Sequence, residues 1–138
     1  MAEIPAVKKM KRFEDTYPDH PKGGFLYLAS LFRKHPDGLL SAYLEASRAQ
    51  GDLWKLGVAV FSPIACFYPT AVLQGIDQTD HETWMERDRP FMRAARGIIV
   101  LQQPGWEASE GIAEEREFFA NRNSPEYSLE FPVCLTKH

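Results

Sequence analysis

Short runs of apolar residues alternate along the chain with longer segments in which apolar and polar positions are mixed. Four of the short runs are flanked by glycine, proline or polar residues, a pattern that predicts buried β-strands. These runs cover residues 25–30, 58–61, 98–101 and 127–133. Apolar residues spaced three or four positions apart predict helices over the segments 39–56, 80–96 and 109–121.

Two proline-containing segments modify this pattern. Pro90 predicts a kink in the helix over 80–96, because proline lacks the amide hydrogen that a helix interior uses. Residues 64–79, which contain Pro69 and Gly75, are predicted to form a mixed loop. The predicted order is therefore strand, helix, strand, loop, helix, strand, helix, strand.

This order of elements predicts a single-domain α/β fold. Apolar strands that alternate with helices favour a mostly parallel sheet covered on both faces. The expected architecture is a three-layer sandwich of the Rossmann or flavodoxin-like type. Ligands of such folds bind outside the carboxyl ends of the strands. The loops 30–38, 62–79 and 102–109 are therefore expected to form the ligand site.

The first part of the chain differs from the rest. Residues 1–24 are polar and punctuated by proline and glycine, so we predict an N-terminal arm there and a folded domain over 25–138. The basic run Lys8–Arg12 is interpreted as part of a solvated tail rather than as a nucleic-acid patch.

Composition argues against several classes of protein. The chain has 138 residues and a net charge of −3, which is not the electrostatic pattern of a nucleic-acid-binding protein. Two cysteines and four scattered histidines predict neither a disulfide scaffold nor a metal site. We see no signal-peptide pattern and no membrane-spanning stretch, so a cytoplasmic protein without a membrane partner is expected.

Two carboxylates fall on helix faces that are otherwise apolar. Glu115 lies on the face of the 109–121 helix that carries Ile112, Phe118 and Phe119. Asp88 lies in a stripe of the 80–96 helix that is formed by Trp84, Phe91, Met92 and Ala95. A buried carboxylate is costly unless it is paired or hydrogen-bonded.

The carboxylates have a structural and a functional interpretation. They could be partners of Arg93, Arg96 or a backbone amide. Two such residues, each beside a predicted ligand loop, favour a functional site instead. Ser109 precedes the second helix, where it can act as an N-cap, as an anion contact, or as both.

Four motifs then occur in a fixed order and spacing. They are Phe25-Leu-Tyr-Leu-Ala-Ser30, Val60-Phe-Ser-Pro-Ile64, Trp84-x-x-x-Asp88 and Gly105-Trp-x-x-Ser109-x-Gly111-x-x-x-Glu115. Together they resemble a branch of small bacterial and phage proteins within the nucleoside 2-deoxyribosyltransferase superfamily. This superfamily includes 2′-deoxynucleoside 5′-monophosphate N-glycosidases and pyrimidine nucleotide hydrolases. The resemblance covers residues 25–133 and is most specific in Ser-x-Gly-x-x-x-Glu.

The resemblance implies roles for three catalytic residues. Glu115 matches the nucleophile, and Asp88 matches the aspartate that protonates or orients the base. Tyr27 matches the tyrosine that hydrogen-bonds the nucleophile. Ser109 stands where the transferases carry an aspartate that binds the 5′-hydroxyl and the monophosphate hydrolases carry a phosphate-facing serine. The serine therefore favours a nucleotide substrate.

Further substrate-binding candidates are Ser30, Arg33, Trp106 and Gly111. Arg33 is either a phosphate ligand or a surface residue of its loop, and Trp106 either stacks on a base or belongs to the core or a lid. The sequence departs from the superfamily in two places. It lacks the usual Gly-Pro after the first strand, and it has Pro90 close to Asp88.

The expected function is cleavage of the N-glycosidic bond of a (deoxy)nucleoside 5′-monophosphate, by hydrolysis or base exchange. The alternatives are a 2-deoxyribosyltransferase acting on free nucleosides, a non-catalytic nucleotide-binding module, and a flavodoxin-like interaction domain with structural carboxylates. The chemistry requires no cofactor. The resemblance also implies a homo-oligomer, a dimer or higher, and a small nucleoside or nucleotide as the partner.

Overall fold

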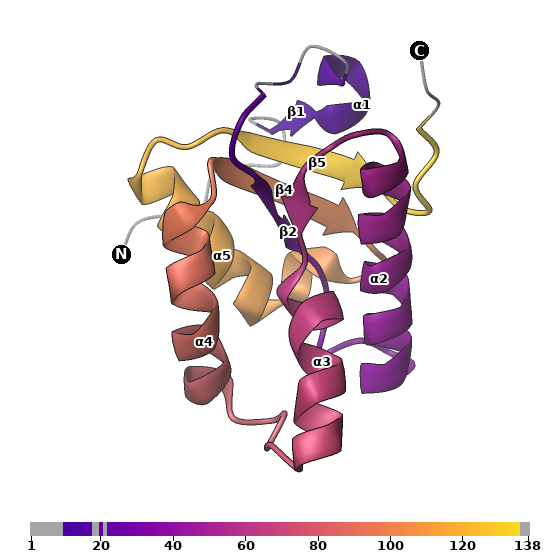
Figure 1. Ribbon diagram of the computed structural model, residues 1–138, viewed down its shortest axis with the longest axis vertical. Helices are drawn as coiled ribbons and strands as arrows, with labels where there is room; N and C mark the ends of the chain where they lie inside the picture. Colours follow the sequence, from indigo (N-terminus) through magenta and orange to yellow (C-terminus); the bar gives the residue numbers. More distant parts are fainter. Residues whose placement is uncertain (1–9, 18–19, 21, 136–138) are drawn as a thin grey trace.

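A computed structural model describes residues 10–17, 20 and 22–135. It is a single α/β domain in which helices flank a five-stranded, all-parallel sheet of order β1-β5-β4-β2-β3 (Figure 1). The elements are β1 (Lys11–Arg12), α1 (Phe13–Thr16), β2 (Leu26–Ala29), α2 (Leu39–Lys55), β3 (Val60–Phe61), α3 (Pro63–Gln74), α4 (His81–Ala94), β4 (Gly97–Gln102), the 3₁₀ helix η2 (Trp106–Ala108), α5 (Glu110–Asn121) and β5 (Glu126–Glu130). This architecture confirms the predicted fold class.

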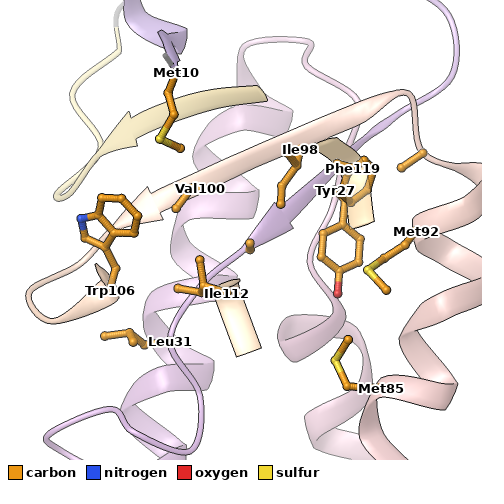
Figure 2. Packing of buried hydrophobic residues seen from close by; sticks show 12 residues of the cluster. Met10, Tyr27, Leu31, Met85, Met92, Ile98, Val100, Trp106, Ile112 and Phe119 are labelled. Carbon is orange, nitrogen blue, oxygen red and sulfur yellow. The ribbon is translucent and has the colours of Figure 1, made fainter. Parts of the chain in front are cut away.

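The central strands β2 and β4 bury both of their faces, as their continuous apolar runs predict. Along β2, Leu26 and Leu28 face one side of the sheet, which α1 and α2 cover. Tyr27 and Ala29 face the other side, where α4 and α5 pack. Figure 2 shows this second cluster, with the Tyr27 ring among the side chains of α4 and α5. Both helices that carry the candidate carboxylates therefore cover the same face.

The prediction of a loop over residues 64–79 was wrong for most of that segment. Residues 63–74 form α3, which packs against α2. The Ser62 hydroxyl accepts a hydrogen bond from the Ala65 amide at 3.0 Å and so caps the helix, and Gly75 ends it in the left-handed conformation with φ of 65°. Tertiary packing thus tolerates Pro69 within the helix.

Residues 11–17, from the segment that was expected to form a polar arm, contribute to the sheet and to the layer that covers it. Lys11 pairs with Tyr127 at the outer edge of β5, in parallel orientation. Phe13 is completely buried, and its ring lies edge-on against Tyr127 with centroids 5.5 Å apart. Within the basic run, Lys11 and Arg12 are exposed, whereas Lys8 and Lys9 lie outside the described residues.

None of the helices that the structure describes has the length and apolarity needed to cross a membrane.

Candidate functional site

A pocket opens at the carboxyl ends of β2, β3 and β4, the edge at which parallel sheets bind ligands. The space within it, including the part that is open to solvent, is about 610 Å³. Its walls come from the segment after β2 (Ser30, Phe32, Arg33, Lys34), the start of α3 (Pro63, Ile64), α4 (His81, Trp84, Met85, Asp88) and α5 with its cap (Ser109, Glu110, Gly111, Glu115).

Two carboxylates meet the Tyr27 hydroxyl at the buried end of this pocket. The hydroxyl lies 3.2 Å from Asp88 Oδ2 and also hydrogen-bonds Glu115 Oε2. Tyr27 is 0 %, Asp88 2 % and Glu115 7 % exposed. The strand alternation of β2 points the tyrosine to the face where α4 and α5 pack, and the apolar faces of those helices carry the carboxylates inward.

Burial changes the acidity of all three groups. It raises the pKa of Asp88 to about 7, although the Tyr27 hydrogen bond and the nearby Arg87 charge act in the opposite direction. Burial raises the pKa of Glu115 well above its ordinary value, and the negative charge of Asp88 adds to this rise. Burial and the two carboxylates also raise the pKa of Tyr27, so its hydroxyl stays protonated at neutral pH.

The phenol links an acid to a base. A phenol has one proton, so Tyr27 can donate to only one carboxylate at a time. The other carboxyl group can then donate its own proton to the phenol oxygen, which is consistent with two raised carboxyl pKa values. Asp88 Oδ1 is buried and has no hydrogen-bond partner in the described part of the chain. The arrangement thus offers a proton donor and a carboxylate to one bound ligand.

The outer part of the pocket combines a helix N-terminus with basic side chains. Ser109 caps α5 by accepting a hydrogen bond from the Ile112 amide at 3.2 Å, which leaves its own hydroxyl proton available to a ligand. Arg33 and Lys34 line the same pocket. The exposed Lys34 ammonium lies 4.0 Å from a carboxylate oxygen of Glu110, which is also on the wall.

The chain matches a family model described as a domain of unknown function (DUF1937), over residues 26–130. The chain belongs to this family. The matched range runs from β2 to the end of β5, and it includes the whole of the pocket and Tyr27. No curated protein matches the chain.

The structure brings most of the predicted site residues of this DUF1937 domain together, with one exception. Ser30, Arg33, Ser109 and Gly111 line the pocket with the two carboxylates, and the Ser30 hydroxyl is buried without a hydrogen-bond partner among the described residues. Trp106 does not line the pocket. It is 7 % exposed and belongs to the same core cluster as Tyr27, but it lies at the opposite end of that cluster (Figure 2).

Arg96, one of the structural partners considered for the carboxylates, does not pair with Asp88 or Glu115. Its guanidinium donates hydrogen bonds to the backbone oxygens of Lys22 and Gly23, the latter at 2.7 Å. Within the described residues, no group of three or more His, Cys, Asp or Glu side chains is arranged to hold a metal ion.

Sequence reasoning missed an aromatic wall of the pocket. Phe32 and Trp84 stack with ring centroids 4.9 Å apart and an interplanar angle of 18°. Trp84 and His81 stand four and seven residues before Asp88 on α4, so helical spacing places all three on one face. That spacing could have indicated these residues as neighbours in a site, but in the sequence it identified Trp84 only as part of an apolar stripe. Phe32 has no such signal, because it lies in an irregular loop.

Proposed function

We propose that this DUF1937 protein cleaves the N-glycosidic bond of a (deoxy)nucleoside 5′-monophosphate. The observation that carries the proposal is the buried Glu115–Tyr27–Asp88 hydrogen-bonded group at the inner end of the pocket. N-glycosidic cleavage develops positive charge at C1′ and negative charge on the departing base. It therefore requires a carboxylate beside the sugar and a proton donor beside the base. The motifs that resemble the nucleoside 2-deoxyribosyltransferase superfamily support the same assignment.

In this mechanism a Glu115 oxygen attacks C1′ of the sugar. The bond from C1′ to the base nitrogen breaks, its electron pair stays on the base, and Asp88 gives its proton to the base. The product is a free base and a sugar ester on Glu115. Water then attacks C1′, the ester bond breaks, and Asp88 takes up the proton that water loses. A second base in place of water gives base exchange.

Tyr27 has a positioning role in both steps. Its hydroxyl donates to Glu115, which orients the carboxylate and opposes the rise of its pKa through burial. Positive charge developing at C1′ also favours the ionised form of Glu115. The pKa of Asp88 near 7 keeps a large share of this group protonated at neutral pH, as a proton donor requires.

The outer part of the pocket supports a 5′-phosphate. The N-terminus of α5 presents backbone amides and the Ser109 hydroxyl, and the positive end of the helix dipole favours an anion there. Arg33 and Lys34 bring two positive charges to the same cavity. Its aromatic wall, made by Phe32 and Trp84, suits the planar face of a base.

One observation favours a second candidate. Glu110 lines the pocket beside Lys34, where its negative charge would repel a phosphate. This residue supports a 2-deoxyribosyltransferase that acts on free nucleosides. The two candidates share the chemistry at Glu115, and Glu110 bears on the difference between them at the 5′ end of the substrate.

Both candidates are tested by incubation with a panel of nucleosides and 5′-monophosphates, in ribose and deoxyribose forms, with and without an added second base. Chromatography of the free bases gives the rate for each compound. Glu115→Gln keeps the size of the side chain and is expected to lower the best rate by at least about a thousandfold. Glu117→Gln, at an exposed position of the same helix, is the matched control and should leave the rate unchanged.

Base release by Glu115→Gln at the wild-type rate would contradict the nucleophile role. Absence of base release from every compound by the wild-type protein would contradict the proposed function.

A further inference from the structure

A buried hydrogen-bond network anchors the loop that forms one wall of the pocket. Gln103 follows β4 directly and is 1 % exposed. Its side-chain oxygen accepts a hydrogen bond from the Leu31 amide at 2.8 Å. Its side-chain nitrogen donates to Glu45 Oε1, also at 2.8 Å. The start of the loop is therefore tied through Gln103 to a carboxylate on α2.

The far part of the same loop reaches the same carboxylate oxygen. The Asp37 amide donates to His35 Nδ1 at 3.1 Å, so the neutral ring carries its hydrogen on Nε2. This Nε2 lies 2.8 Å from Glu45 Oε1 and donates to it. The His35 side chain is 4 % exposed, and Glu45 is half-buried. Glu45 Oε1 thus accepts two hydrogen bonds that hold the loop at two points.

The residues between these anchors face the ligand. Phe32, Arg33 and Lys34 lie between Leu31 and His35 in the sequence, and all three line the pocket. The segment has turns but no regular secondary structure. The side-chain hydrogen bonds at Leu31 and His35 add to two backbone hydrogen bonds, from the His35 amide to the Phe32 oxygen and from the Gly38 amide to the His35 oxygen. The anchoring residues Glu45, Gln103 and His35 are not part of the pocket lining, and neither the sequence motifs nor the proposed chemistry assigns them a role.

We propose that Glu45 is a positioning residue for ligand binding. Through Gln103 and His35 it holds the loop in the conformation that presents Arg33 and Lys34 to the anionic group of a ligand. That this ligand is a nucleoside 5′-monophosphate rests on the proposed function. The groups that perform the chemistry lie outside the loop, on β2, α4 and α5. Glu45 therefore affects how tightly the substrate is held and not how fast the bound substrate reacts.

The test compares Glu45→Ala with a matched control on the same helix. Asp52 lies two turns further along α2 and is half-buried like Glu45, and its side chain forms no hydrogen bond or ion pair within the described chain. Glu45→Ala should raise the KM for the monophosphate roughly tenfold and leave kcat within about twofold. Asp52→Ala should change neither constant. Glu45→Gln keeps an acceptor oxygen and should restore most of the affinity.

Hydrogen exchange followed by mass spectrometry tests the anchoring without any turnover. In Glu45→Ala, amides of the 30–38 peptide should exchange faster while the peptide of α5 keeps its wild-type protection; Asp52→Ala should match wild type in both.

Three outcomes would overturn the positioning role: unchanged exchange of the 30–38 peptide in Glu45→Ala, a uniform increase over the whole domain, or a fall in kcat at constant KM. If wild type releases no base from any compound, the proposed function fails, and the exchange comparison alone still decides whether Glu45 anchors the loop.

Discussion

Replacement of Asp88 by asparagine should stabilise the protein above neutral pH while it removes the proposed proton donor. Asp88 is 2 % exposed, and burial is the main cause of its raised pKa. The ionised carboxylate is therefore held in an unfavourable environment when the protein is folded. Asparagine has nearly the same shape and keeps an oxygen that can accept the Tyr27 hydrogen bond, but it carries no charge at any pH.

The size and sign of this effect follow from the acidity of the group. The pKa of Asp88 rises from 3.8 to about 7 in the folded protein. Between these values the folded state binds more protons than the unfolded chain, so the free energy of unfolding falls as the pH rises through this window. At 1.36 kcal/mol per pKa unit, full ionisation of Asp88 costs up to ~4 kcal/mol. Asp88→Asn avoids that cost.

The assay is urea unfolding of wild type and Asp88→Asn from about pH 4 to about pH 8. The free energies of unfolding should differ least at the acid end, and the variant should gain up to ~4 kcal/mol over wild type at the alkaline end. Glu86→Gln removes an exposed carboxylate from the same helix and should show no such trend. A difference between wild type and Asp88→Asn that stays constant with pH would show that ionisation of Asp88 does not destabilise the folded protein. Base release should fall in the same variant through kcat rather than KM.

Two further predictions concern the outer part of the pocket. Ser109→Asp places a negative charge against the 5′-phosphate. The variant should lower kcat/KM for a monophosphate, relative to its nucleoside, by about ten- to a hundredfold. If the wild-type protein prefers the free nucleoside, the result instead favours the transferase. Glu110→Gln removes an exposed carboxylate that lies 4.0 Å from the Lys34 ammonium, and should lower the KM for a monophosphate by up to about fivefold. An equal change in KM for the nucleoside would show that Glu110 does not act on the phosphate.

Much of the fold could be predicted because β2, β3 and β4 lie within continuous apolar runs. The predicted strand over 98–101 is β4, and the helix over 39–56 is α2 to within a residue. β1 gave no signal because two exposed residues have no periodicity, and its pairing with β5 depends on contacts far away in the sequence. α3 was missed because Pro69 was interpreted as a helix breaker, whereas packing on α2 retains the helix.

The carboxylates of the site could be found for a similar reason. Helical periodicity alone places Asp88 and Glu115 on buried faces. Their meeting at Tyr27 could not be derived from periodicity, because it depends on two helices covering the same face of the sheet. The bond between Leu31 and Gln103 spans 72 residues and has no local pattern at all. Trp106 was assigned to the site from its sequence position, but a tryptophan after a strand fits a core position and a ligand wall equally well. The sequence alone therefore could not decide between these two positions for Trp106.

A covalent bond between Glu115 and the sugar can be measured directly as the mass of the protein during turnover. A nucleoside 5′-monophosphate with fluorine at C2′ slows hydrolysis of the ester, because fluorine opposes positive charge at C1′. After incubation, we expect a mass increase equal to the fluorinated sugar phosphate, located by peptide mapping on Glu115 and absent from Glu115→Gln. Release of the base with the label on another residue, or with the same label in Glu115→Gln, would contradict the bond to Glu115.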